Sequence, residues 1–151
     1  MGFILQEITI RTDNSSAGMA KIDELWRDVV SGKIPLMYDS TGSFQQGLSP
    51  VSRYSNYASD ETGEYDLSIF TAKADFFTEM TQKTGHGEYA AYDSDGADIK
   101  DAANKAWSRV WNDKQNNKIR RAFTQDYEST VPGTYTKDGR AHCYLFIALK
   151  V

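Results

Sequence analysis

The sequence predicts an α+β fold built from two tandem strand–helix–strand–strand modules related by a pseudo-twofold axis. Two helix-like segments, 19–30 and 99–111, begin about 80 residues apart, and two strand-like runs follow each of them. Self-similarity of this kind indicates a duplicated structural unit. We therefore expect a single domain over 1–151, with pseudo-repeats of about 1–80 and 81–151. Its antiparallel sheet should carry the two helices on one face.

Alternating hydrophobicity and turn residues define the first module. Its three strands are expected at 3–12, 51–58 and 64–74. Gly32 and Pro35 end the helix that the sequence predicts over 19–30. The segment 38–49, rich in Gly, Ser and Gln, predicts a loop, and 60–63 has the composition of a hairpin turn.

The second module repeats this order. Its strands are expected at 86–92, 122–129 and 141–151. Asp93–Gly96 has the composition of a turn and precedes the helix predicted over 99–111. The helix has an apolar stripe with two tryptophans beside it: Ile99, Ala103, Ala106 and Val110, then Trp107 and Trp111.

Composition limits the classes of function. The chain has 17 basic and 21 acidic residues and a net charge of −4, which argues against a nucleic-acid or membrane-binding surface. Lys118, Arg120 and Arg121 form its basic cluster, which is expected to be a solvated turn. No apolar run approaches the roughly 18 residues of a membrane span, and no signal peptide opens the chain. A soluble, cytoplasmic protein is therefore expected.

No motif predicts a cofactor, a metal site or a catalytic residue. The sequence has no metal-ligand cluster, no phosphate-binding glycine loop and no nucleophile elbow. Cys143 is the single cysteine, so no internal disulfide can form. It lies in an apolar run and is expected to pack as a small hydrophobic residue.

The last strand separates its side chains by parity. Odd positions from 141 to 151 are aliphatic or small, whereas His142, Tyr144 and Phe146 occupy even positions. Because neighbouring residues point to opposite faces, the odd positions should face the helices. Alignment of the repeats pairs Phe70 with Phe146, so both modules place a ring on the second face. Such a face is either covered by loops or lines a site.

Two acids precede that strand. Asp126 and Glu128 share one side of their own strand and are predicted to lie on the face of Tyr144 and Phe146. A carboxylate buried among rings is costly unless the site takes a cation. The alternative is that both carboxylates are edge-strand charges in water. The repeat equivalent of Glu128 is expected near Ala58, so one module alone should carry the acid.

Five segments occur in a characteristic order: His86–Tyr92, Gly96, Ala106–Trp111, Asp126–Glu128 and Tyr144–Leu149. In this order they resemble the GyrI-like family, also known as the effector-binding domain of AraC- and MerR-type bacterial transcription activators. The similarity is clearest over residues 86–151. Free-standing members, including some carried on integron gene cassettes, look the most similar, because this chain begins and ends with the domain.

This resemblance implies two modules about a pseudo-twofold axis that bind lipophilic, often cationic compounds in a cleft between them. It implies that Glu128 faces the cation and that Trp107 stacks on the ligand. Together with the repeat alignment, it gives these candidate ligand-binding residues: Glu128, Trp107, Trp111, Tyr144, Phe146 and Phe70.

Three functions follow as hypotheses. The first is non-catalytic binding of a hydrophobic cationic small molecule, without any DNA-binding domain. The second is a hydrolase of small reactive compounds, with Glu128 as general base and Tyr144 or His142 as acid. The third is a protein-interaction module, such as a modulator of DNA gyrase. No helix-turn-helix segment is present, so direct binding to nucleic acid is not expected.

Overall fold

A computed structural model gives the structure of the chain. It describes residues 7–30, 49–59, 62–72, 74–131, 133 and 137–150. These residues form six strands and three helices, which confirms the α+β class. The chain divides into two compact units, Met1–Phe77 and Thr78–Val151, close to the predicted repeats. The loop predicted over 38–49 lies, except for its last residue, outside the described residues.

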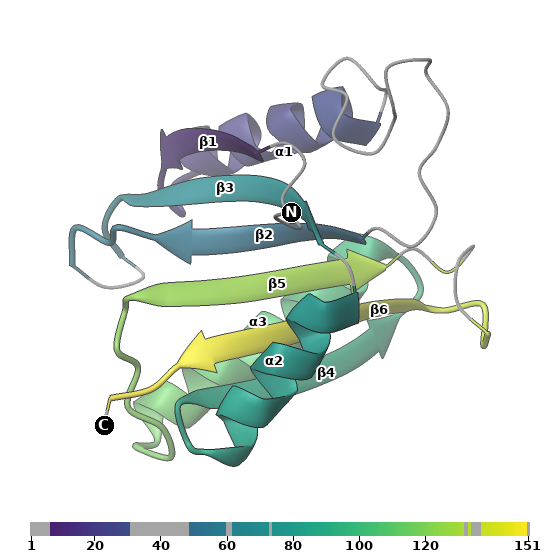
Figure 1. Cartoon of the computed structure of the whole chain (residues 1–151). Coiled ribbons are helices and arrows are strands. Elements are labelled where there is room, and N and C mark those ends of the chain that lie inside the picture. The colour runs from purple at the N-terminus through teal and green to yellow at the C-terminus, as the bar shows by residue number, and fades with distance from the viewer. Residues whose placement is uncertain are drawn as a thin grey trace. The chain divides into compact units, whose positions relative to one another are not determined.

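The first unit has the predicted order of elements. They are β1 (Glu7–Thr12), α1 (Ser16–Val30), β2 (Ser49–Ser55) and β3 (Tyr65–Ala72) (Figure 1). The strands form an antiparallel sheet in which β3 pairs with both β1 and β2. Ile22 and Leu25 of α1 form one core with Leu67 and Ile69 of β3. The helix thus covers the face of β3 that carries odd-numbered side chains.

The second unit repeats this topology. Its elements are β4 (Tyr89–Gly96), α3 (Ile99–Gln115), β5 (Gln125–Val131) and β6 (Ala141–Ala148). Here β6 pairs antiparallel with both β4 and β5, as β3 does with its neighbours in the first unit. The internal duplication is therefore confirmed in the order of elements and in the pairing of strands.

Small residues on α3 allow close packing on the second sheet. The Asp98 side chain caps this helix by accepting a hydrogen bond from the Asp101 backbone N–H. The core combines the buried stripe of α3 with the odd positions of β6: Ala102, Ala106 and Val110 with Cys143, Leu145 and Ile147. The parity predicted for the last strand is confirmed. Ile99, predicted in the stripe, lies in the first turn and is 46% exposed.

The turn predicted at Asp93–Gly96 is wrong. These residues belong to β4 and pair with the start of β6, from Gly96 opposite Ala141 to Asp93 opposite Tyr144. The composition is typical of turns. Here, however, hydrogen bonding to β6 keeps the backbone extended, and the chain turns only after Gly96.

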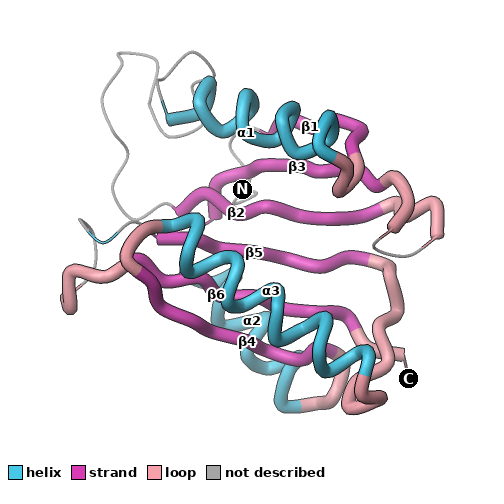
Figure 2. Tube along the Cα trace, turned by 180° about the vertical axis from the view of Figure 1, so that it is seen from behind, coloured by secondary structure: helices cyan, strands magenta, loops and turns pink. Residues whose placement is uncertain are grey.

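A third helix, α2 (Ala74–Gly85), was not predicted. Three threonines weaken its helical propensity, although Phe76 and Met80 are four residues apart and Asp75 lies in the first turn. Figures 1 and 2 view the molecule from opposite sides. They place α3 on one face of the β4–β6 sheet and the Thr78–Gly85 part of α2 on the other. The ring-bearing face predicted from the last strand is therefore partly covered by a helix.

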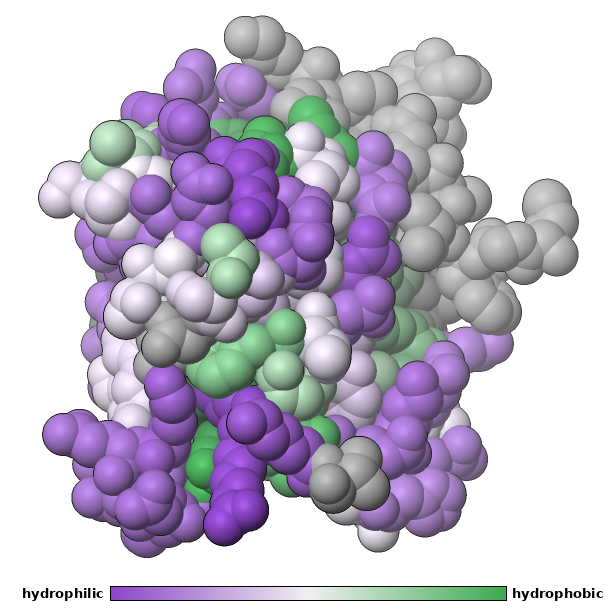
Figure 3. All heavy atoms as spheres, turned by 90° about the vertical axis from the view of Figure 1, so that its left-hand side faces the viewer, coloured by the Kyte–Doolittle hydropathy of each residue, from purple (hydrophilic) through white to green (hydrophobic). Residues whose placement is uncertain are grey.

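Polar side chains prevail on one face of the molecule (Figure 3). On the face drawn in Figure 3, hydrophilic side chains surround smaller hydrophobic areas. No helix among the described residues is long and apolar enough to cross a membrane. Large hydrophobic side chains exposed in the described part of the chain are Met19, Ile99, Trp111 and Tyr144. Two of them, Trp111 and Tyr144, are candidate site residues.

Replacing Gly96 by alanine should destabilise the second unit. A Cβ atom at Gly96 would lie 2.6 Å from the backbone nitrogen of Ala102, at the close approach of β4 to α3. We expect Gly96→Ala to lower the free energy of unfolding by about 1–3 kcal/mol. Gly85→Ala is the control, because a Cβ there meets no atom within 4 Å. Urea unfolding of both variants measures the difference, and equal stabilities would show that this close approach is not required.

Candidate functional site

A hydrogen bond between an indole and a carboxylate links α3 to β5. Trp107 Nε1 donates to Glu128 Oε1 over 2.5 Å, and the Thr130 hydroxyl donates to Glu128 Oε2 over 3.0 Å. Both Trp107 and Glu128 are half-buried. Glu128 lies opposite Leu145, on the face of the sheet that packs against α3. The structure therefore brings together two of the predicted site residues.

The predicted face of Glu128 is wrong. In the register of β5 on β6, Tyr127 is opposite Phe146 and Glu128 is opposite Leu145. Residues directly opposite each other point to the same face, so Glu128 faces away from Tyr144 and Phe146. Parity within a strand does not give the register between strands, and a shift of one residue inverts every face.

Trp111 extends the site along α3. Its ring centroid lies 6.1 Å from that of Trp107, with 30° between the ring planes. Residues four apart on a helix are neighbours, which explains the contact. Trp111 is 44% exposed, whereas Trp107 is half-buried. The two indoles therefore form a wall that runs from the Glu128 carboxylate to solvent.

A buried ion pair packs against this wall. Arg121 Nη2 lies 2.8 Å from Asp126 Oδ2, and the two side chains are 1% and 0% exposed. Asp126 Oδ1 also accepts the backbone N–H of Ala148. The Arg121 guanidinium lies 5.8 Å from the Trp107 ring centroid and 4.4 Å from that of Phe123. The solvated turn predicted for Arg121 is therefore wrong, because Asp126 and two rings enclose its charge.

Phe123 adopts an unusual backbone conformation beside this pair. Its φ of 55° lies in the left-handed region, which bulky residues rarely occupy. Such a conformation persists only where surrounding contacts hold it. The Phe123 ring contacts two cations, Arg121 and Lys114, whose Nζ is 5.1 Å from the ring centroid. These contacts hold the segment between α3 and β5 against the Trp107 side chain.

Cys143 lies beneath the carboxylate. Its Sγ is 3.6 Å from the Thr130 hydroxyl, and the side chain is fully buried. Burial raises the pKa of the Cys143 thiol, and the nearby Glu128 carboxylate raises that pKa further. A thiol in this environment stays protonated and unreactive, as expected for a cysteine that packs as a small hydrophobic residue.

Tyr144 and Phe146 lie on the other face of the second sheet. Tyr144 is 38% exposed and stacks on His142, with centroids 6.1 Å apart and 11° between the planes. Phe146 is 8% exposed. This placement argues against Tyr144 or His142 as the general acid of a hydrolase, because neither side chain lies on the same face of the sheet as Glu128.

Phe70, the candidate from the first unit, is buried on the face of its sheet away from α1. Its ring packs edge-on against Phe76, with centroids 5.8 Å apart. The Arg53 guanidinium lies 5.7 Å from the Phe70 centroid. These contacts within the first unit are those of a core ring.

The repeat equivalent of Glu128 is Ser52 and not a residue near Ala58. Val51 pairs with Phe70 as Tyr127 pairs with Phe146, so Ser52 takes the place of Glu128. The Ser52 hydroxyl is buried and makes no hydrogen bond with any described residue. Of these two equivalent positions, the one in the second unit carries a carboxylate and the one in the first unit carries a hydroxyl, so one module alone carries the acid, as predicted.

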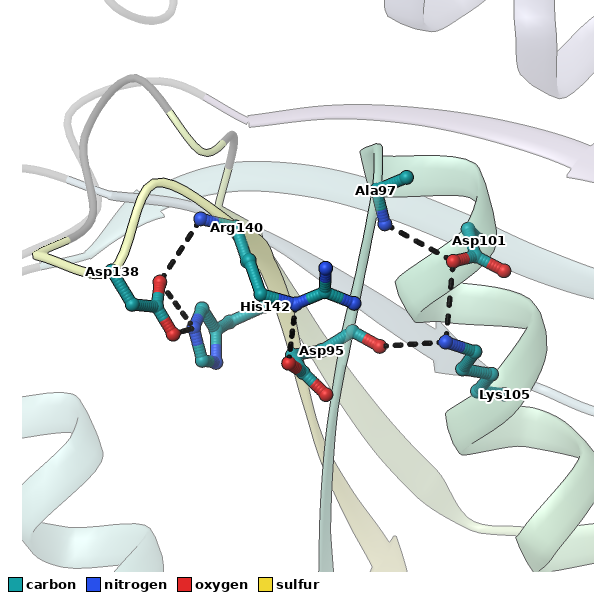
Figure 4. A network of polar contacts seen from close by, with 7 residues as sticks. All are labelled: Asp95, Ala97, Asp101, Lys105, Asp138, Arg140 and His142. Atoms are coloured by element: carbon teal, nitrogen blue, oxygen red, sulfur yellow. Dashed lines mark hydrogen bonds and ion pairs between the residues drawn. The ribbon is translucent and has the colours of Figure 1, made fainter.

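A second polar cluster, missed from the sequence, surrounds the edge strand β4. Lys105 Nζ lies 3.3 Å from the Asp95 carbonyl oxygen, and Arg109 Nη1 donates to the Asp93 carbonyl oxygen over 2.5 Å. Arg140 pairs with Asp95 (Figure 4). Charged side chains at an exposed strand edge hinder its pairing with another chain. The signal in the sequence was two cations four residues apart on the helix that follows this acidic strand.

Comparisons with known proteins support the fold. A crystal structure of an integron cassette protein from the mobile metagenome of Vibrio cholerae matches with a TM-score of 0.63 and 20% sequence identity. The match covers 95% of this chain and 90% of that chain. At this identity the similarity shows the fold alone. No model of a known protein family matches the chain. No curated protein matches it either.

Breaking the buried ion pair should strongly destabilise the protein. Asp126→Asn would place a neutral amide against Arg121 and remove the carboxylate that lies 2.8 Å from the buried guanidinium. We expect the free energy of unfolding to fall by about 3–5 kcal/mol. Asp95→Asn is the control, because it removes the exposed pair with Arg140 and should change stability little. If thermal denaturation shows similar losses for both variants, the interior pair has no special role.

The Cys143 thiol should react with a thiol reagent only when the protein unfolds. It is fully buried and its pKa is raised, so both access and thiolate formation are suppressed. Because the chain has one cysteine, a colorimetric thiol assay reads this position alone. Full reaction in concentrated urea is the control. Rapid reaction of the native protein would contradict the packing of β6 against α3.

Proposed function

We propose that this protein binds lipophilic organic cations at the cluster of Trp107, Trp111 and Glu128. The observation that carries the proposal is the half-buried Glu128 carboxylate, held by the Trp107 N–H and the Thr130 hydroxyl. Two donors fix the orientation of this carboxylate before a ligand arrives. A preorganised group loses less conformational freedom on binding, which favours affinity.

The electrostatics of the cluster suit a cation. The Arg121 guanidinium is paired with Asp126 at 2.8 Å, and the Glu128 carboxylate is held by two neutral donors, an indole N–H and a hydroxyl. Each indole face can add about 0.5–2 kcal/mol of cation–π attraction, with the larger values at desolvated faces. Trp111, at 44% exposure, offers a ring face that a flat ligand can reach from solvent.

The resemblance to the GyrI-like effector-binding domain supports the same function. It assigns the role of facing the cation to Glu128 and that of stacking to Trp107. We propose that the chain is a member of this family similar to those carried on integron gene cassettes. The similarity in fold to an integron cassette protein agrees with this assignment.

Glu128→Gln should weaken the binding of cations selectively. The change keeps the shape and a hydrogen-bond acceptor for Trp107 but removes the negative charge. We expect 10-methylacridinium, a permanent cation, to bind about 5- to 30-fold more weakly, a loss of about 1–2 kcal/mol. Neutral acridine at pH 8 should bind wild type and variant alike. Quenching of tryptophan fluorescence measures both ligands.

The control is Glu79→Gln, which removes an exposed carboxylate of α2 that belongs neither to the Glu128 cluster nor to the polar cluster around β4. It should leave the affinity for 10-methylacridinium unchanged. If Glu128→Gln lowers the affinity for both acridines equally, the charge of Glu128 has no role in binding. No quenching by either compound would favour the alternative of a protein partner.

A further inference from the structure

An open pocket of about 450 Å³ lies at the edge of the second sheet. Its lining comes from β4, α3 and β6 and includes Asp93, Asp95, Lys105, Arg109, His142 and Tyr144. None of the residues of the Glu128 cluster lines it. The pocket therefore offers a site that the proposed cation binding does not use.

Opposite charges face this pocket without pairing with each other. The Asp93 carboxylate makes no hydrogen bond or ion pair with any described residue, whereas Asp95 is paired with Arg140. Arg109 uses one N–H on the Asp93 carbonyl oxygen, and its guanidinium lies 5.5 Å from the Tyr92 ring centroid. A guanidinium has five N–H donors, so Arg109 keeps donors for a ligand.

Lys105 adds a second positive charge at the same edge. Its ammonium is held near the Asp95 carbonyl oxygen and near the Asp101 carboxylate, each at 3.3 Å (Figure 4). The pocket thus has a cationic side on α3 and an anionic group on β4. A ligand with one charge would match one side and face a like charge on the other.

A flat aromatic surface completes the pocket. Tyr144 is directly opposite Asp93 in the β4–β6 ladder, so the ring and the carboxylate lie on the same face. His142 stacks on Tyr144 with 11° between the ring planes, which fixes the orientation of the phenol ring. Tyr144 is 38% exposed and offers its surface to a ligand ring.

We infer that this pocket binds a small zwitterion with a flat ring, the chemistry of an aromatic amino acid. The ammonium group pairs with Asp93, the carboxylate with Arg109 beside Lys105, and the ring packs on Tyr144. This arrangement uses the Asp93 carboxylate, the Arg109 guanidinium and the exposed Tyr144 ring at once. It is independent of the Glu128 cluster, so either site can fail its test without the other.

The test is a titration of the ¹⁵N-labelled protein followed by NMR chemical shifts. L-phenylalanine is compared with 2-phenylethylamine, which lacks the carboxylate, and 3-phenylpropionate, which lacks the ammonium. We expect saturable shifts at Asp93, Arg109 and Tyr144. Each singly charged analogue should bind about two- to fivefold more weakly, as exposed charge pairs allow.

Variants assign each charge. Asp93→Asn should abolish the preference for phenylalanine over 3-phenylpropionate. Arg109→Gln should abolish the preference for phenylalanine over 2-phenylethylamine. Glu128→Gln should change none of these affinities. Arg109 also donates a hydrogen bond to β4, so circular dichroism checks that the Arg109→Gln variant is folded. Tyr144→Ala, at an exposed position, is a second variant, and it should weaken the binding of all three compounds.

Three results would overturn the inference. The first is equal affinity for the three compounds, which would exclude recognition of both charges. The second is loss of phenylalanine binding in Glu128→Gln, which would move the site to the other cluster. The third is the absence of saturable shifts at the pocket residues.

Discussion

Strand β6 is hydrogen-bonded on both sides, to β4 and to β5, and the register of these two ladders decides which side chains of the second unit share a face. It sets Glu128 opposite Leu145, toward α3, and Asp93 opposite Tyr144, on the other side. Both candidate sites depend on this register. A shift of one residue in the β5–β6 ladder would turn Glu128 away from Trp107, and the same shift in the β4–β6 ladder would turn Asp93 away from Tyr144.

The segment between α3 and β5 connects the helix to this register. Asp126 binds the Arg121 guanidinium with one oxygen and the Ala148 backbone N–H with the other, so a buried carboxylate joins the segment to the end of β6. Arg121 in turn packs on the ring of Trp107. The indole N–H is thereby held where it meets Glu128. The ion pair thus acts on the proposed cation site through position and not through contact with a ligand.

The two sites differ in how their charges are arranged. In the Glu128 cluster, Arg121 is paired with Asp126, and the Glu128 carboxylate lies beside two indoles. In the β4 edge pocket, the Asp93 carboxylate and the α3 cations remain separate around an exposed ring. A cation suits the first arrangement and a zwitterion the second. Helix α3 contributes to both sites, with Trp107 and Trp111 at the first and Lys105 and Arg109 at the second.

The sequence alone determined the α+β class, the duplication, and the odd-numbered face of β6, because helical spacing and strand alternation are local patterns. It also placed Trp107 and Trp111 beside the apolar stripe of their helix. Only the tertiary structure decided that Glu128 faces Trp107, that Ser52 is its repeat equivalent, and that Arg121 is buried. These facts depend on strand register and on partners distant in sequence. No local pattern encodes them, because register is set by the packing of the whole sheet.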